Sequence, residues 1–531
     1  MAFACNKAQA LRPRAAATRA SRASRVHRAF ATATAPNSSS GAGEKSTTGI
    51  VNVDTEDVLP LRTLRDKLTP KQSPFVIDNN GGVGFVDEND RVMLNALHYG
   101  SDVSAGATCI NGMMVDDGNC AILPAWAIRS GARRTIYFDA KNVRAAIVTC
   151  GGLCPGLNDV VRSLVTTLED YGVGLDPENE KSAIHGIYYG FGGFYQGDRK
   201  PHARLNRAFV DGIQNRGGTI LGTSRGGSDV VEIVKAIKEL DVNMLFVVGG
   251  NGGNAGANAI DQECEKQGYD CSVVGIPKSI DNDILLIDRC FGFDTAVQEA
   301  VRAIAAAKVE ASSARNGVGV VKLMGRQSGF ISMAAATASG DVDLCLIPEV
   351  PFVLDGPTGA LAHVEKHVKD KGHAVIVVAE GAGQDVLGAD SETDASGNPI
   401  LKDVGPFMRD AIKKHFKSIG SSADVKYIDP SYMIRACETV PTDKIYCMTL
   451  AQGAVHAAFA GYTGLTVGLV NGHYCYLPIK TVIQAANVVD IRGKQWNRLL
   501  MVTKQPAWGT LSDASPVASM MDFDDDISIL G

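Results

Sequence analysis

The stretch MLFVVGGNGGNAGANAI, residues 244–260, decides how the rest of the chain is interpreted. Its first five residues are continuously apolar, as in a strand buried on both faces of a sheet. Four glycines around Asn251 follow, and then an alanine-rich segment that predicts a helix. A glycine turn between a strand and a helix is a common phosphate-binding device. Phosphate chemistry usually needs a metal held by a carboxylate, yet this loop offers Asn251.

The same order of strand, glycine turn and helix recurs along the chain from residue 144. Short apolar strands that alternate with helices predict an α/β fold with parallel sheets covered on both faces. Ligands of such sheets bind at the carboxyl ends of the strands, which is where these glycine turns lie. The predicted strands are 145–149, 244–248, 272–276, 318–325, 374–381 and 464–470. The predicted helices are 228–240, 294–311, 328–338 and one that begins near residue 158.

The heptapeptide PKSIDND, residues 277–283, carries the clearest chemical signal. Lys278 is a cation that can meet phosphate, and Pro277 stiffens the end of the preceding strand. Asp281 and Asp283 lie two residues apart, so in an extended segment they face the same way. One could take a proton from a hydroxyl while the other engages a metal. Taken alone, the heptapeptide is equally compatible with a surface turn.

Two other nucleotide sites fit the glycine loop less well. Gly250, Gly252 and Ala255 satisfy G-x-G-x-x-A, but a dinucleotide site would place an acidic residue at the end of the next strand. That strand instead runs into PKSIDND, which suits a phosphoryl centre. The chain also has no G-x-x-x-x-G-K-[ST] motif, which excludes a P-loop enzyme.

Eight motifs together resemble the 6-phosphofructokinase family, in particular its ATP-dependent plant and algal type. In chain order they are GGLCPGLNDVVR, LGTSRGG, GGNGG, PKSIDND, FGFDTAV, MGRQSGF, VAEGAG and YMIR, within residues 134–490. The resemblance implies two doubly wound, parallel-sheet α/β lobes with the active site in the cleft between them. Residues 144–292 with 436–487 would form the ATP-binding lobe, and residues 293–435 with 488–512 the fructose 6-phosphate lobe.

On the nucleotide side, the resemblance implies that Asp281 is the general base for the sugar 1-hydroxyl. Arg225 would stabilise charge on the transferred group, and Lys278 completes the catalytic set. The residues implied to bind ATP are Gly152, Arg225, Gly226, Asn251, Gly252, Gly253 and Asn254.

On the sugar side, the resemblance implies that two guanidinium groups, Arg326 and Arg435, bind the sugar phosphate, a task that their planar forks suit. Ser279 stands where the family usually has threonine, and its hydroxyl can still bond the incoming phosphate. The residues implied to bind fructose 6-phosphate are Ser279, Ile280, Asp281, Met324, Gly325, Arg326, Glu380, Lys426, Tyr432, Met433, Ile434 and Arg435.

The family's Gly-Gly-Asp-Gly-Thr/Ser loop reads Gly-Gly-Asn-Gly-Gly here. Gly252 favours ATP over pyrophosphate as donor, whereas Lys278 occurs with both donors. Asn251 and Asp283 would hold Mg²⁺, but the amide of Asn251 carries no charge. We therefore expect an active or weakly active kinase. The alternative is a catalytically silent subunit that binds sugar phosphate within a hetero-oligomer; a nicotinamide dehydrogenase is a weaker third hypothesis.

Composition limits the class of protein. The 531 residues are 45% hydrophobic and 21% charged, as in a globular enzyme, and no apolar run is long enough to span a membrane. Residues 1–43 contain seven Lys or Arg and no acid, which predicts a transit peptide, with a disordered basic arm as the alternative. The Ala/Ser/Thr bias favours a chloroplast over a mitochondrion. Without this segment Lys plus Arg falls from 52 to 45 against 58 acids, and a net charge of −13 argues against nucleic-acid binding.

The remaining segments give weaker signals. Residues 44–143 predict an extension packed against the core, and residues 513–531 an acidic tail. The resemblance implies a homo-oligomer with fructose 6-phosphate and ATP as ligands, but an interface arginine of bacterial-type members falls on Gly317. The twelve cysteines form no CxxC pair. The pairs Cys150/Cys154 and Cys109/Cys120 are therefore either inert thiols or redox-active.

Overall fold

The computed structural model describes residues 57–76, 84–94, 124–176, 178–196, 202–227, 229–388 and 400–508, and the backbone of 113–116 and 119–121. The predicted transit peptide, the predicted acidic tail, Cys109 and the side chain of Cys120 lie outside the described residues.

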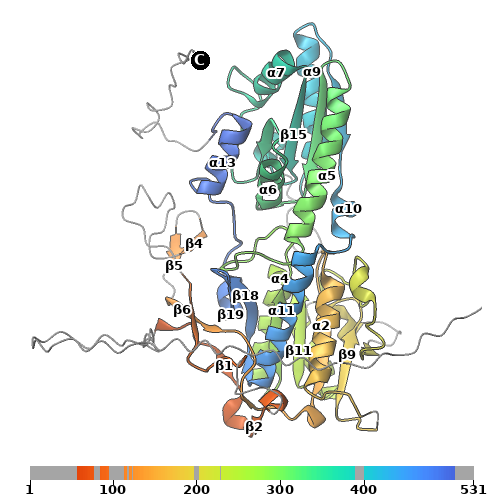
Figure 1. The fold of residues 1–531 in the computed structure, drawn as a ribbon, viewed down its shortest axis with the longest axis vertical. Helices are drawn as coiled ribbons and strands as arrows, with labels where there is room; N and C mark the ends of the chain where they lie inside the picture. The colour runs from red at the N-terminus through yellow and green to blue at the C-terminus, as the bar shows by residue number, and fades with distance from the viewer. Residues whose placement is uncertain are drawn as a thin grey trace, which may run out of the picture. The chain divides into compact units, whose positions relative to one another are not determined.

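A nine-stranded sheet forms the larger of two layered halves (Figure 1). Its five central strands are parallel, as the alternation of strands and helices predicts. Both edges add antiparallel strands, which the sequence analysis did not predict. The order is β10 (His202–Arg204), β9 (Ala183–Ile187), β8 (Arg144–Thr149), β11 (Met244–Gly249), β12 (Ser272–Pro277), β18 (Leu465–Val470), β19 (His473–Pro478), β6 (Trp126–Arg129) and β3 (Arg91–Met93).

The change of direction between β18 and β19 has a local cause. Asn471 and Gly472 link the two strands with φ angles of 49° and 77°. Two consecutive left-handed residues of this type form the tight hairpin turn that matches the twist of antiparallel strands. The dipeptide Asn-Gly was therefore a readable hairpin signal.

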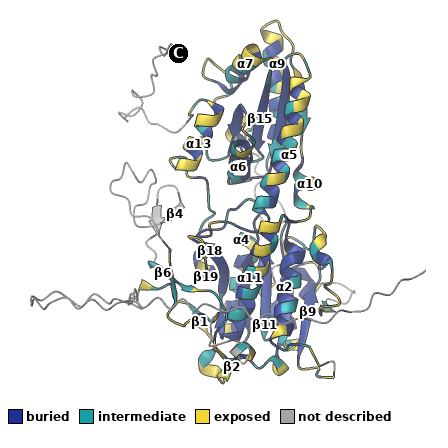
Figure 2. Cartoon of the chain, in the orientation of Figure 1, coloured by how far each residue is buried: buried dark blue, intermediate teal, exposed yellow. Residues whose placement is uncertain are grey.

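The second sheet has four strands, all parallel, in the order β14 (Leu344–Leu346), β15 (His373–Ala379), β13 (Gly317–Leu323) and β16 (Asp424–Ile428). β13, β14 and β15 are predominantly buried, as Figure 2 shows for β15, whereas only one of the five residues of β16 is buried. Because β13, β14 and β15 are covered on both faces, they consist mainly of consecutive apolar residues and not of alternating ones.

Helices cover both faces of each sheet. In the larger sheet, Ile147 packs into one core with α2 (Leu157–Asp170) and α11 (Pro441–Phe459). The neighbouring residue Val148 packs into a second core with α3 (Val230–Glu239) and α4 (Asn251–Lys266). This alternation is the period of two that strand geometry dictates. The smaller sheet packs against α5 (Phe293–Ser312), α6 (Phe330–Ser339), α7 (Ala360–Lys371) and α9 (Val404–Ser418) in a single core.

The segment before β8 is built into the larger half and is not an independent domain. Besides β3 and β6, β1 (Arg62–Thr63) pairs with β17 (Tyr462–Thr463), and β2 (Lys71–Gln72) pairs with β7 (Thr135–Ile136). Residues 53–531 form one compact unit, so the two sheets share it. The proposed lobe boundaries remain a prediction, although the strands of residues 465–478 do join the larger sheet.

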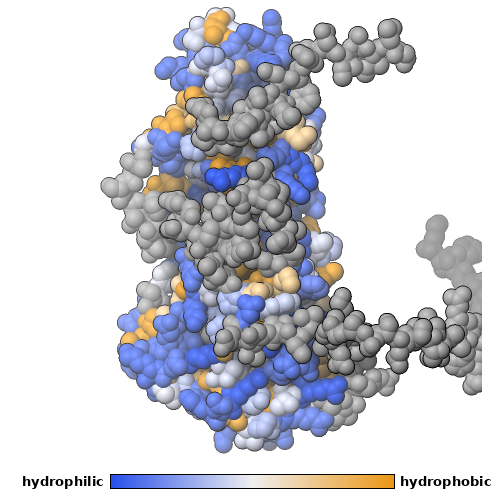
Figure 3. Space-filling view, turned by 90° about the vertical axis from the view of Figure 1, so that its left-hand side faces the viewer, coloured by the Kyte–Doolittle hydropathy of each residue, from blue (hydrophilic) through white to orange (hydrophobic). Residues whose placement is uncertain are grey.

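The visible surface is mainly polar. On the face shown in Figure 3, hydrophilic side chains predominate and hydrophobic ones occur in scattered small groups. Within the described ranges, no helix has both the length and the apolar content that crossing a membrane requires.

Candidate active site

The carboxyl ends of strands from both sheets open onto one cavity of about 960 Å³. Ile280, on its wall, packs against the cores of both sheets, which places the cavity where the two layered halves meet. Most of the residues predicted from the sequence line it: Gly152, Arg225, Gly226, Asn251, Gly252, Gly253, Lys278, Ser279, Ile280, Asp281, Asp283, Met324, Arg326, Glu380, Tyr432 and Arg435.

Five residues of the predicted site do not line the cavity. Asn254 is buried beneath the glycine loop, where its Nδ2 donates to the carbonyls of Gly249 (3.2 Å) and Gly250 (3.1 Å). Ile434 lies in the core of the smaller sheet, whereas Met433 is 77% exposed. Lys426 pairs with Asp424, and the φ of +131° at Gly325 serves the turn after β13.

Three cations approach the first glycine turn, between β8 and α2. A Cβ placed on Gly152 would lie 3.8 Å from Arg435 Nη1 and 3.9 Å from Arg225 Nη2. A Cβ on Gly151 would lie 3.6 Å from Lys278 Nζ. The bare backbone therefore leaves room for an anionic group within reach of all three positive charges.

The second glycine loop is the one that ends β11. Asn251 is the first residue of α4, so the free N–H groups of this sixteen-residue helix begin at the cavity. A Cβ on Gly252 would meet no described atom within 4 Å, so this position is open space. A Cβ on Gly249 would lie only 2.8 Å from Gly253 Cα. The loop thus uses Gly249 for close packing and Gly252 for access.

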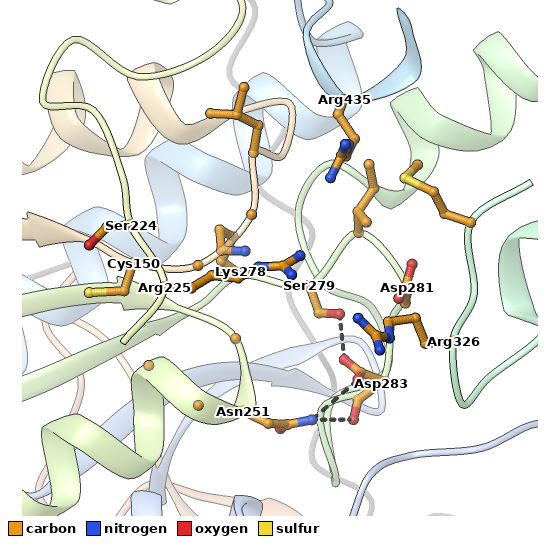
Figure 4. A pocket seen from close by; sticks show the side chains of 18 of the residues that line it. Cys150, Ser224, Arg225, Asn251, Lys278, Ser279, Asp281, Asp283, Arg326 and Arg435 are labelled. Atoms are coloured by element: carbon orange, nitrogen blue, oxygen red, sulfur yellow. Dashed lines mark hydrogen bonds between the residues drawn. The ribbon is translucent and has the colours of Figure 1, made fainter. Parts of the chain in front are cut away.

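The PKSIDND segment is a turn and not the extended segment that the sequence analysis assumed. Asn282 has a left-handed φ of 61°, and its N–H donates to the Ser279 carbonyl at 3.3 Å. The expectation that Asp281 and Asp283 face the same way because they lie two apart is therefore wrong. Asp283 accepts bonds from Ser279 and Asn251, whereas Asp281 is not part of that network (Figure 4).

Asp281 carries an unsatisfied acceptor. Its Oδ1 is inaccessible to solvent and has no hydrogen-bond partner among the described residues. The pKa of Asp281 is raised to about 7, first by burial and then by the nearby Asp283 and Glu380 carboxylates, against the opposing charge of Lys278. A carboxylate with a pKa close to neutral, aimed at a cavity, is suited to general-base catalysis.

The donor atoms near Asn251 fit a magnesium ion. Asn251 Nδ2 donates to the Asp283 carbonyl (3.2 Å) and to Asp283 Oδ2 (3.3 Å), while Asn251 Oδ1 is buried and finds no partner in the described part of the chain. One carboxylate and one amide oxygen are hard ligands that leave further positions for phosphate and water. The described part of the chain contains no group of three or more His, Cys, Asp or Glu that could hold a metal without such help.

The opposite wall of the cavity is a network of side chains. Glu380 follows β15, and burial raises its pKa while Arg326, Lys322 and Arg435 lower it. The guanidinium carbon of Arg435 lies 4.8 Å above the Tyr432 ring, a cation–π contact that holds the arginine beside the cavity. This wall therefore presents two guanidinium groups and one carboxylate.

Comparison with known proteins agrees with this geometry. A family model described as "Phosphofructokinase" matches residues 144–458. The chain belongs to the phosphofructokinase family. It is 53% identical over 423 residues to the ATP-dependent 6-phosphofructokinase 5, chloroplastic, of Arabidopsis thaliana, covering 80% of this chain and 76% of that protein. It is 44% identical over 386 residues to the ATP-dependent 6-phosphofructokinase of Borreliella burgdorferi, covering 71% and 85% respectively.

Solved structures of phosphofructokinases share the fold. A pyrophosphate-dependent phosphofructokinase from Marinobacter aquaeolei aligns with a TM-score of 0.55 at 19% identity, covering 68% of this chain and 92% of that one. The phosphofructokinase of Saccharomyces cerevisiae aligns with a TM-score of 0.52 at 22% identity, covering 68% and 48%. At these identities the likeness concerns the fold alone.

The phosphofructokinase motifs did not reveal several residues of the cavity. Lys322 lies on its wall and pairs with Asp429 (2.8 Å) and Asp403 (3.1 Å). A lone charge in the apolar run VGVVKLMG was the available signal. The apolar wall made by Phe191, in the 3₁₀ turn after β9, with Val230 and Ile233 of α3 carried no motif at all.

The cysteines beside the phosphofructokinase glycine turn fit the inert alternative. Cys150 and Cys154 are buried and unpaired. Burial raises the pKa of the Cys150 thiol to about 12 and that of Cys154 further above its ordinary value. Thiols with so little thiolate character are poor nucleophiles.

Proposed function

We propose that this chain transfers the γ-phosphoryl group of ATP to the 1-hydroxyl of fructose 6-phosphate, giving fructose 1,6-bisphosphate and ADP in glycolysis. The observation that carries the proposal is Asp281, a carboxylate with a near-neutral pKa and an unpartnered Oδ1 in a phosphate-binding cavity. Relatives named ATP-dependent 6-phosphofructokinase support the choice of donor and acceptor.

Proton transfer and phosphoryl transfer would use different parts of the cavity. Ionised Asp281 takes the proton of the sugar 1-hydroxyl while the hydroxyl oxygen bonds to the γ-phosphorus of ATP. The bond between the γ-phosphorus and the β,γ-bridging oxygen breaks. Arg225 and Lys278, which both approach the first glycine turn, face the charge that develops on the transferred group. ADP leaves with the bridging oxygen.

The nucleotide would lie along the two glycine turns. Its phosphates fit over Gly152 and the start of α4, where backbone N–H groups and open space coincide. The apolar wall that includes Phe191 and Ile233 suits the adenine base. Asn251 and Asp283 would hold Mg²⁺, which neutralises phosphate charge when it is bound.

The sugar would lie against the side-chain wall. Arg326 and Arg435 offer paired donors for the 6-phosphate, and the Glu380 carboxylate can accept from sugar hydroxyl groups. This arrangement would leave the 1-hydroxyl directed at the Asp281 side of the cavity.

We further propose a plastid location and a homo-oligomer. The composition of residues 1–43 supports import into a plastid, as do similar proteins whose names include "chloroplastic". Tyr432 and Met433 are 79% and 77% exposed next to the cavity, a placement that supports a neighbouring subunit covering them.

The direct test is product formation by the purified chain with Mg²⁺, fructose 6-phosphate and either ATP or pyrophosphate. We expect fructose 1,6-bisphosphate with ATP and a far lower rate with pyrophosphate. Faster turnover with pyrophosphate would refute the assignment of the donor. Absence of product with either donor would instead favour the second candidate.

That second candidate is a catalytically silent subunit that binds sugar phosphate beside an active relative. It draws support from Asn251, whose neutral amide donates to Asp283 directly. A carboxylate at position 251 would repel Asp283 unless a cation lay between them. Asn251→Asp separates the two candidates. A silent chain would gain Mg²⁺-dependent turnover on this substitution, whereas an active kinase would already show it and would rise by at most about 10²-fold.

A further inference from the structure

Four basic side chains gather at the β10 edge of the nine-stranded sheet, away from the catalytic cavity. In β9, His185 pairs with Ala146 of β8, two residues after Arg144, and with Arg204 of β10. His202 of β10 pairs with Ile187 of β9. Residues that pair across neighbouring strands point to the same face of a sheet, and so does every second residue along one strand. Arg144, His185, His202 and Arg204 therefore share one face of the sheet. Figure 1 shows β9 at this edge.

This basic edge cluster contains buried nitrogen atoms without partners. His185 is 6% exposed, and neither of its ring nitrogens has a hydrogen-bond partner among the described residues. Arg144 Nε is likewise buried and unpartnered within the described chain. The rings of His185 and His202 lie edge to face with centroids 4.9 Å apart. Buried polar groups are nearly always satisfied, so adjacent unsatisfied donors indicate a missing ligand.

The charges of the cluster select the kind of ligand. Neither Arg144 nor Arg204 makes an ion pair with a carboxylate of the described residues. The pKa of His185 is lowered to about 4, first by burial and then by the charges of His202, Arg144 and Arg204. Two imidazoles alone could bind a metal, but two guanidinium groups beside them repel cations. An anion is favoured instead.

We propose that Arg144, His185, His202 and Arg204 form a second oxyanion site, which takes inorganic phosphate or the phosphate group of a phosphate monoester. Within this cluster Arg204 is exposed and His185 is buried. Guanidinium forks and imidazole N–H groups are the usual partners of such dianions. None of the four residues lines the catalytic cavity, and the proposal does not depend on the function assigned to that cavity.

Equilibrium dialysis of the full chain against radiolabelled inorganic phosphate tests the site. The variant Arg144→Gln/Arg204→Gln removes both guanidinium groups. The matched control Arg91→Gln/Arg129→Gln removes two arginines from the opposite edge of the same sheet. Any phosphate bound in the catalytic cavity would be common to all three proteins, so the difference between them isolates the cluster. We expect the cluster variant alone to lose one phosphate per chain, through an affinity at least about tenfold weaker.

A second variant keeps the proposal testable if the arginine double variant does not fold. His185→Met replaces the unsatisfied imidazole by an apolar chain of similar size, and we expect it to melt at a higher temperature than wild type in phosphate-free buffer. Added phosphate should raise the melting temperature of wild type more than that of His185→Met. Equal phosphate binding by wild type and either variant would overturn the site. Unlabelled glycerol 3-phosphate, added to the dialysis, separates the two kinds of ligand. If it displaces labelled phosphate from the cluster, the site accepts phosphate monoesters; if it does not, the site takes free phosphate.

Discussion

The two walls of the catalytic cavity are built in opposite ways. The wall contributed by the nine-stranded sheet is largely backbone, with glycine at positions such as 152 and 252, and Arg225, Lys278 and Arg435 approach its first glycine turn. The wall contributed by the four-stranded sheet consists of long side chains held by one another, as Lys322 is held by Asp429 and Asp403.

The difference follows from what each wall is suited to bind. A triphosphate has no preferred side-chain partner and is best met by helix N-termini and bare N–H groups. A sugar phosphate must be distinguished from other sugars, which requires directed donors and acceptors at fixed positions. Asp281 lies between the two walls, so its substitution should not distinguish between the two substrates. Substitutions within one wall should instead change the KM for the substrate that this wall binds.

The largest effect is expected for Asp281→Asn. Loss of the base should lower kcat by about 10²–10⁴-fold, while the KM values for both substrates change little. Steady-state kinetics with ATP and fructose 6-phosphate measure this effect. Asp159→Asn is the matched control, because burial also raises the pKa of Asp159, to about 6, outside the cavity. A residual kcat within tenfold of wild type would remove Asp281 from the mechanism.

The backbone wall is tested by Gly252→Asp. Because a Cβ at this position meets no described atom within 4 Å, we expect the fold to be retained. The new carboxylate would oppose the phosphates and raise the KM for ATP by about 10²-fold, with the KM for fructose 6-phosphate nearly unchanged. Gly252→Asn adds the same volume without charge and should have a much smaller effect. Similar losses in both variants would mean that volume, not charge, governs this wall.

The side-chain wall is tested by Lys322→Gln. Without its ammonium group, Glu380 and Asp429 lose a partner and the wall loosens, so the KM for fructose 6-phosphate should rise about tenfold. The KM for ATP should stay close to its wild-type value. Lys308→Gln serves as control, since Lys308 pairs with Asp341 away from the cavity. A rise in the KM for ATP alone would reverse the assignment of the two walls.

A smaller effect is expected from pH. As the proposed base, Asp281 would act only when ionised, and its pKa in the folded chain is raised to about 7, so we expect activity to be lost as pH falls through 7. The value of kcat/KM should rise about threefold between pH 6.5 and pH 7.5, as measured from initial rates at subsaturating substrate. A flat profile over this range would show that proton transfer to Asp281 does not limit the rate.

The smallest expected effect concerns stability. Because folding raises the pKa of Asp281, its ionised form destabilises the folded chain above the pKa of the unfolded state, near 4, and increasingly up to pH 7. Asp281→Asn removes this cost, so its melting temperature should exceed that of wild type by about 2–4 °C at pH 8 and by less at pH 5. Calorimetry at both pH values measures the difference. An equal rise in melting temperature at pH 5 and pH 8 would mean that packing, and not the charge of Asp281, causes the difference.

The amino-acid sequence by itself determined the backbone wall. Apolar runs that end in glycine turns and the PKSIDND heptapeptide are local signals, because phosphate needs bare backbone and charge close together in the chain. The parallel centre of the larger sheet could be predicted on that basis, and most of the predicted site residues do line the cavity.

Only the tertiary structure decided the rest. The left-handed Asn282 separates the roles of Asp281 and Asp283, and Lys322 meets Asp429 across 107 positions of the chain. The sequence did not reveal that Met433 points to solvent or that His185 and His202 meet at a sheet edge. Such contacts depend on strand register and on packing between distant segments, which residue types at fixed spacing do not specify.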